Sequence, residues 1–344
     1  MITTKRKIFT LIILIIVLLL LSGCESILEN SNEDSATVDI TGSLITENGD
    51  EKVKTDGLIV LKNDNEEVDR TYKDIDKDKF QFENIPLGNY TLEIHRLGSE
   101  TIIEEISIAE EENISLGEFV VNLEQPVEED EKNLLYFIGI NTNDSPLDDE
   151  KIRLALNYAL DKNHLANEAK MVLENENEEK VFEVERAKRV APPSVAGYEN
   201  TVDINLEQDQ TEAENLIVNS RYENSEIDFY YSEDNYLHSH LKDEIKDFVD
   251  NLEGLSINLV EDSFENIVSN QESVYMFGNR YDRNPVAPYE NFLDLDNESK
   301  DLLEKAKMNM DDKEKSLEYV LELEKKLIND GRIIPLYHYS SYEK

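Results

Sequence analysis

The sequence predicts a mixed fold, in which an N-terminal all-β sandwich (residues 37–124) precedes an α/β lobe (residues 133–344). Two observations lead to this prediction. As far as residue 124, short runs of alternating apolar and polar residues are separated by turn residues, which is typical of β-strands. Beyond residue 133, short apolar runs alternate with amphipathic stretches of helical period, which indicates α/β architecture.

The charge of the chain limits its partners. Its 344 residues include 77 acidic and 34 basic side chains, for a formal net charge of −43. A field of this sign repels nucleic acid, so we expect no nucleic-acid partner. The carboxylates either keep the protein soluble, for example in salty or alkaline surroundings, or select a cationic ligand. The single cysteine excludes an intrachain disulfide bond.

The N-terminus has the pattern of an export signal. A positive region, Lys5–Lys7, precedes an apolar run of about 14 residues, which is shorter than the roughly 20 residues of a membrane-spanning helix. The run ends in Leu21-Ser22-Gly23-Cys24, which resembles the lipobox of bacterial lipoproteins, whose cysteine takes a diacylglyceryl group. The resemblance implies a signal peptide (1–23), lipidation of Cys24, and a tether (24–36) at the outer face of the cell membrane, on its extracellular or periplasmic side. Two acyl chains anchor a protein stably. The alternative is an uncleaved signal anchor.

The all-β part contains the signals of about seven short strands, which favours a sandwich. The predicted strands are Val38–Leu44, Leu58–Leu61, Phe80–Phe82, Tyr90–Ile94, Ile102–Ile108 and Phe119–Leu123. Residues 78–92, DKFQFENIPLGNYTL, resemble the G-x-F-x-F-x-x-L-P-x-G-x-Y-x-L signature of carboxypeptidase-regulatory-like sandwiches. Such modules are generally spacers or adhesion elements, so the resemblance implies no catalysis.

An acidic linker (125–132) leads into the α/β part. The predicted elements are strands at Leu134–Ile140, Leu255–Leu259, Val274–Phe277 and Ile333–Tyr337, a helix capped by Asp148, a helix with a Thr211/Glu214 capping box, a helix over Leu237–Leu252 ended by Gly254, and helices over Glu298–Met310 and Asp312–Asn329. The linker has almost nothing to bury, so we expect few contacts between the two parts and independent folding.

Four ordered segments resemble family 5 extracellular solute-binding proteins, the peptide, oligopeptide and nickel receptors of ABC importers. Residues 137–162, FIGINTNDSPLDDEKIRLALNYALDK, are similar to N-x-x-x-x-P-x-x-D-x-x-V-R-x-A-L-x-x-A-I-D-R. The others are APP at 191–193 with Gly197-Tyr198, DNLEGLSINL at 250–259, and residues 306–337, which end in IIPLY. The resemblance implies a lobe of the periplasmic-binding-protein type II kind. It covers only the second of the family's two lobes, which implies a truncated or divergent receptor.

The same resemblance implies the ligand contacts. In the family, an aromatic–acidic–proline segment after a strand presents an aspartate to the α-ammonium group of a peptide, a charge-assisted contact. The corresponding segment here, GNRYDRNP, contains Tyr281 and Asp282. We therefore expect Asp282, Tyr281 and Asn141 to bind the ligand. The alternative is that Asp282 pairs with Arg280 or Arg283 at a surface loop.

These inferences predict a membrane-anchored solute-binding lipoprotein of a peptide-type ABC importer. Its partners would be a peptide or other small solute, ABC permease subunits, and the membrane through lipid on Cys24. The alternative is a surface interaction or spacer lipoprotein in which the α/β lobe is a scaffold without tight ligand binding. We expect no enzyme, cofactor or metal site: His238 and His240 are two apart on a predicted helix and point to different sides, and no phosphate loop or Ser-His-Asp arrangement stands out.

Overall fold

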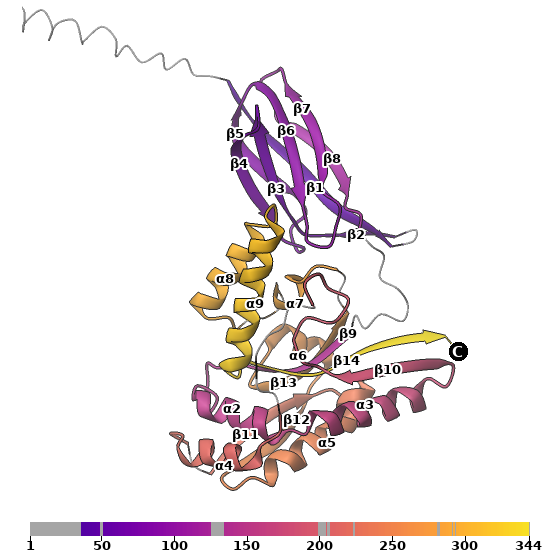
Figure 1. The fold of residues 1–344 in the computed structure, drawn as a ribbon, viewed down its shortest axis with the longest axis vertical. Helices are drawn as coiled ribbons and strands as arrows, with labels where there is room; N and C mark the ends of the chain where they lie inside the picture. The colour runs from indigo at the N-terminus through magenta and orange to yellow at the C-terminus, as the bar shows by residue number, and fades with distance from the viewer. Residues whose placement is uncertain are drawn as a thin grey trace, which may run out of the picture.

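The structure is a computed structural model that describes residues 36–48, 51–124, 134–198, 204, 207–222, 224–280, 283–290, 292 and 294–343. The predicted signal peptide, the tether as far as residue 35, and the linker lie outside these residues, as do Tyr281 and Asp282. Figure 1 shows a β-domain (residues 36–124) beside an α/β domain (residues 134–343). None of the helices described is long and apolar enough to cross a membrane.

Two four-stranded sheets form the β-domain. One sheet contains β1 (Thr37–Asn48), β2 (Glu51–Lys54), β5 (Phe80–Pro86) and β8 (Ile114–Val120), and the other has the order β4 (Glu66–Lys73), β3 (Gly57–Asn63), β6 (Gly88–His95), β7 (Ile102–Ile108). Side chains from both sheets, including Ile40, Phe82 and Leu92, form one buried cluster. The alternation in sequence predicted most of these strands, but it missed β2 and β4, and it placed the last strand at Phe119–Leu123, where the structure has β8 at Ile114–Val120. The sequence of β4, EEVDRTYK, is largely polar and this strand lies at a sheet edge, so it lacks the apolar alternation of a half-buried strand.

A six-stranded sheet runs through the α/β domain. Its order is β10 (Lys180–Arg186), β14 (Ile333–Glu343), β9 (Leu134–Ile140), β13 (Val274–Arg280), β11 (Ser225–Tyr231), β12 (Leu255–Glu261). Strands β11, β12 and β13 are parallel, and β9 is antiparallel to both of its neighbours.

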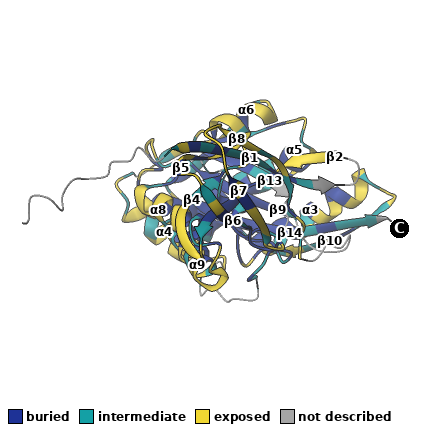
Figure 2. Ribbon diagram, turned by 90° about the horizontal axis from the view of Figure 1, so that it is seen from above, coloured by how far each residue is buried: buried dark blue, intermediate teal, exposed yellow. Residues whose placement is uncertain are grey.

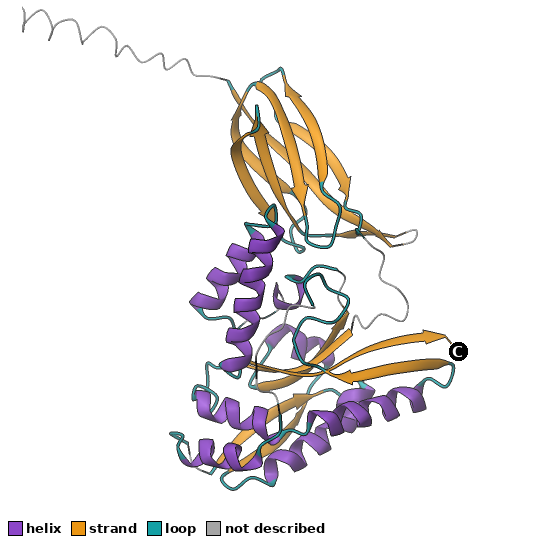
Figure 3. Cartoon of the chain, viewed as in Figure 1, coloured by secondary structure: helices purple, strands orange, loops and turns teal. Residues whose placement is uncertain are grey.

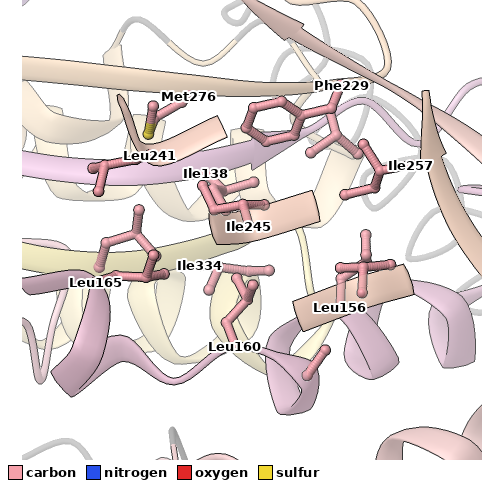
Figure 4. Close-up of a cluster of buried hydrophobic side chains, with 14 of the residues drawn as sticks. Ile138, Leu156, Leu160, Leu165, Phe229, Leu241, Ile245, Ile257, Met276 and Ile334 are labelled. Atoms are coloured by element: carbon pink, nitrogen blue, oxygen red, sulfur yellow. The ribbon is translucent and has the colours of Figure 1, made fainter. Parts of the chain in front are cut away.

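Helices cover both faces of this sheet (Figure 3). One face packs against α2 (Glu150–Ala159), α3 (Lys162–Glu176), α4 (Gln210–Val218) and α5 (Tyr236–Asp250), and the other against α6 (Phe264–Asn270), α7 (Ala287–Glu290), α8 (Asn297–Lys307) and α9 (Lys313–Asn329). The buried side chains on the face covered by α2 to α5 form the first core of the α/β domain, and those on the face covered by α6 to α9 form the second core. Figure 4 shows the first core, where Ile138 and Met276 of the strands lie near Leu241 and Ile245 of α5. The mixed α/β fold and the predicted stripe of α5 are thus confirmed.

Two predicted helix starts are wrong by one or two residues. Helix α2 is capped by Asp149, whose carboxylate accepts from the Lys151 amide, and not by Asp148. Helix α4 is capped by Asp209, whose carboxylate accepts from the Glu212 amide, and not by Thr211 with Glu214. Aspartate is as good an N-cap as serine and better than threonine, so a short acidic segment offers several possible starts.

The expectation of few contacts between the two parts is wrong. Strand β3 is buried on both faces: Ile59 and Leu61 belong to the core of the β-domain, whereas Leu58 and Val60 belong to the second core of the α/β domain. The sequence signal was the continuous apolar run, because a strand buried on one face alternates and a strand buried on both does not. Figure 2 shows the result, with buried residues along the central strands of both domains and exposed residues on the outer helices.

Candidate functional site

The carboxyl ends of β11 and β12 lie at one edge of the six-stranded sheet, and the parallel strand β13 begins beside the end of β11 and continues past it. We call this edge the carboxyl edge. After β11 the chain enters α5 on one face of the sheet, and after β12 it enters α6 on the opposite face. Open α/β sheets bind ligands where two neighbouring strands lead to helices on opposite faces. The topology therefore favours a ligand site at the carboxyl edge.

Aromatic rings from both faces meet at this edge. The imidazole of His238 on α5 and the ring of Phe264 on α6 have centroids 5.7 Å apart. The Phe264 ring also stacks on Phe277 of β13, at 6.1 Å and an interplanar angle of 9°. Phe264 remains 36% exposed, so the edge offers solvent an aromatic surface directly above a buried histidine.

Two buried polar atoms at the edge have no hydrogen-bond partner among the described residues: Nε2 of His238 and Oγ of Ser232. The Nδ1 atom of His238 accepts from the Ser232 amide at 3.3 Å. Burial lowers the pKa of His238 to about 4, so the ring is neutral and its single proton is on Nε2. A buried donor without an acceptor costs about 1–3 kcal/mol, and such exceptions in native proteins need an explanation. An acceptor group of a ligand would satisfy it.

Tyr136 on β9 completes the edge, and a glycine determines where its ring lies. A Cβ atom on Gly278, its cross-strand partner, would lie 2.1 Å from Cε2 of Tyr136, so the ring lies flat over the glycine. This position lets the Tyr136 hydroxyl lie 3.1 Å from Nδ2 of Asn235, the N-cap of α5. The ring stacks on Tyr337 at 5.3 Å and 11°. Burial raises the pKa of Tyr136, which keeps its hydroxyl protonated.

Of the three predicted ligand residues, Asn141 is the one that the structure describes. Asn141 follows Ile140, which pairs with Val274 at the start of β13, whereas Tyr281 and Asp282 follow the end of that strand. At about 3.3 Å per residue, the two ends of β13 are roughly 20 Å apart. The Asn141 side chain donates to the Gln271 carbonyl at 3.0 Å and accepts from Asn143, contacts that shape its own loop.

The other predicted site residues, Cys24, Tyr281 and Asp282, lie outside the described residues. Arg283, one of the alternative partners of Asp282, donates to the Ser194 carbonyl at 2.9 Å. Among the residues that the structure describes, no group of three metal-binding side chains occurs.

Sequence reasoning missed Phe264 and Ser232, and it considered His238 only as a metal ligand. The available signal was local: Ser263 caps α6, so Phe264 is the first residue of a helix that follows a strand. The start of α5, with His238, lies beside Phe264 because of the order of the strands in the sheet. A local sequence pattern does not contain that order.

Several solved structures are similar to this chain in fold. The chain shares its fold with ABC substrate-binding proteins. The match to CtaP of Listeria monocytogenes, an ABC transporter substrate-binding protein, has a TM-score of 0.52 at 19% identity and covers 61% of this chain and 45% of that one. The match to AppA of Clostridium difficile, a putative peptide-binding protein, has a TM-score of 0.52 at 20% identity and covers 62% of this chain and 46% of that one. The oligopeptide-binding protein AppA of Bacillus subtilis, in complex with a nonapeptide, gives 0.50 at 16%, with 62% and 47% covered.

The α/β region thus has the fold of these substrate-binding proteins, as the sequence resemblance led us to expect. The matched share equals the α/β domain in size, and the chain spans less than half of the length of these structures. No protein-family model matches the sequence. No curated protein matches it either.

Proposed function

We propose that this chain is a membrane-anchored solute-binding lipoprotein that binds a peptide or similar small solute at the carboxyl edge. The observation that carries the proposal is the pair formed by Phe264 and His238, an exposed ring above a buried, unsatisfied donor, at the edge where this fold favours a ligand. Lipid on Cys24 would hold the protein at the outer face of the membrane, and an ABC permease would receive the solute.

The chemistry of the edge suits a peptide. Nε2–H of His238 can donate to a carbonyl or carboxylate oxygen, and the rings of Phe264 and Phe277 can pack against an apolar side chain. Because the Nε2 atom is buried, a side chain beside it must move for the ligand to reach it. Tyr281 and Asp282 follow β13 in the chain, and we retain them as proposed contacts for the ammonium group of the solute.

The β-domain contacts the residues that directly follow Tyr281 and Asp282 in the chain. Arg283, which directly follows Asp282, is so close to the β-domain that a Cβ atom on Gly98 would lie 2.3 Å from its own Cβ. Asn284 donates to Asp56 of the β-domain at 2.7 Å. We propose that the β-domain supplies a second wall beside the ligand, in a chain that is shorter than the binding proteins that share its fold.

Calorimetric titration of the detergent-solubilised mature chain with a mixed peptide pool tests this function. A hydrogen bond that stays open to water contributes only about 1 kcal/mol net, so we expect a dissociation constant no tighter than roughly 0.1 mM. Phe264→Ala should weaken binding several-fold. Ile103→Ala, which truncates an exposed apolar residue of β7, is the matched control and should not.

A second candidate function is a surface scaffold or spacer, and the extensive burial of β3 between the two domains favours it, because rigid docking suits a structural role. Failure of the chain to bind any peptide of the pool at about 1 mM would support the scaffold. If Phe264→Ala leaves peptide binding unchanged, the peptide does not bind at the carboxyl edge.

A further inference from the structure

A buried polar cluster connects the two domains. The β-domain contributes Asp56 and Tyr72, and the α/β domain contributes Asn284, Glu290 and Lys307. Asp56 is 1% exposed and accepts from Arg96 of its own domain at 2.8 Å and from Asn284 at 2.7 Å. The boundary between the domains therefore depends on charged groups that are removed from water.

One hydroxyl lies between two carboxylates in this cluster. The Tyr72 oxygen is 2.6 Å from Oδ2 of Asp56 and 3.1 Å from Oε1 of Glu290. A phenol has a single proton, so it can donate to only one of them. If Glu290 is ionised and Tyr72 donates to Asp56, the carboxylate of Glu290 faces a lone pair of the Tyr72 oxygen. If Glu290 carries a proton, it donates to Tyr72, which donates to Asp56, and the hydrogen bonds form one chain across the boundary.

Charges around the pair determine which carboxylate takes the proton. The groups that face Glu290 from the elements packed against it are Tyr72 of β4, Asp56 of the β2–β3 connection with its partner Arg96, and Lys307 of α8 with its partners Asp74 and Glu304.

Burial alone would raise the pKa of Asp56, but Arg96 and the Tyr72 hydrogen bond bring it below its usual value. Lys307 is 3.2 Å from Glu290 and 2.9 Å from Asp74, so its charge is divided between two acids. The proton therefore belongs on Glu290.

We propose that protonation of Glu290 controls the docking of the β-domain on the α/β domain, so that the domains bind each other tightly in mildly acidic medium and loosen in alkaline medium. This regulation acts on the boundary itself and holds whether or not the proposed peptide function is correct. The Tyr72 hydroxyl links the two sides of the boundary, because it contacts a carboxylate of each domain and can donate its proton to only one of them.

The direction of the pH dependence follows from the thermodynamic linkage between docking and protonation of Glu290. Burial, and then the charge of Asp56, raise the pKa of Glu290 from an ordinary 4.5 to about 7, against the opposing effect of Lys307. A carboxyl group whose pKa is raised on docking stabilises the docked form below its ordinary pKa, and this contribution is lost as the pH rises through the docked value. From about pH 6 to about pH 8.5, the docking constant should fall about tenfold.

Amide hydrogen exchange of the full chain in detergent, followed by mass spectrometry, tests the proposal. After correction for the chemical exchange rate, peptides that cover β3 and residues 284–290 should exchange about tenfold faster at pH 8.5 than at pH 6, relative to peptides of α5. Glu290→Gln, which keeps a donor toward Tyr72 but cannot ionise, should abolish this dependence. Glu318→Gln, at an exposed position of α9 outside the cluster, is the matched control and should retain it.

Tyr72→Phe provides an independent variant, since it removes the shared hydroxyl and leaves the ring under Lys307. Burial and the charge of Asp56, and not this hydroxyl, raise the pKa of Glu290, so the pH dependence should persist in this variant while the boundary peptides exchange faster at pH 6 than in the unaltered chain. The proposal is overturned if boundary peptides of the unaltered chain exchange equally at both pH values, or if Glu290→Gln retains the tenfold change.

Discussion

Replacement of Asp56 by alanine should strongly destabilise the boundary between the domains. The Asp56 carboxylate accepts from Arg96, Tyr72 and Asn284, and all of these bonds are lost in Asp56→Ala. The Arg96 side chain is only 3% exposed, so its charge would remain buried without its carboxylate. Removal of one partner of a buried ion pair costs about 3–5 kcal/mol. The Asn284 amide loses an acceptor, which adds about 1 kcal/mol.

This loss is a large part of the roughly 5–15 kcal/mol that stabilises an ordinary domain. Denaturant unfolding of the chain, followed by fluorescence and circular dichroism, measures it. Glu118→Ala is the control, because it removes one partner of an exposed pair with Lys52 and should change little. The double variant Asp56→Ala/Arg96→Met should recover most of the loss, since an apolar pair avoids the buried charge.

A loss below about 1 kcal/mol in Asp56→Ala, or no recovery in the double variant, would refute the assignment of the cost to the unpaired guanidinium. The same experiment tests whether the domains unfold together. The second core crosses the boundary through Leu58, Val60 and Leu97, so we expect one transition for the unaltered chain. Two separate transitions would restore the expectation of independent folding.

Four further predictions concern single features. Gly278→Ala should displace the Tyr136 ring and lower the free energy of unfolding by about 1–3 kcal/mol, which denaturation combined with near-ultraviolet circular dichroism would detect. The imidazole resonances of His238 should stay those of a neutral ring down to about pH 5, because burial lowers its pKa to about 4; titration near the ordinary value of 6.5 would contradict its burial. With a net charge of −43, the melting temperature should rise between low salt and about 1 M NaCl, since screening weakens carboxylate repulsion; a flat or falling curve would exclude repulsion as the main factor. Cys24→Ala should leave a precursor without lipid, and mass spectrometry of the membrane fraction that finds mature chain with an unmodified Cys24 would contradict the lipobox.

Some elements were predictable because their signal is local. The stripe of Leu237, Leu241, Ile245 and Val249 specifies both the helix and its buried face, and α5 forms there. The predicted stop at Gly254 is wrong, because the helix ends at Asp250 with Asn251 as its C-cap, and Gly254, at a φ of 91°, lies in the turn before β12. Strands such as β4 and helices such as α6 escaped prediction, since β4 has largely polar residues and α6 has only two turns. Short or polar elements owe their structure to neighbours and not to their own periodicity.

The sequence by itself predicted the two-part organisation and the mixed fold, and it carries the hypotheses of an export signal with Cys24 and of a family resemblance in the α/β part. Only the tertiary structure decided that β3 is shared by two cores and that His238 meets Phe264. The physical reason is that hydrophobic periodicity acts along a single element, whereas strand order and the docking of one sheet on another bring together residues that are far apart in the chain and share no local pattern.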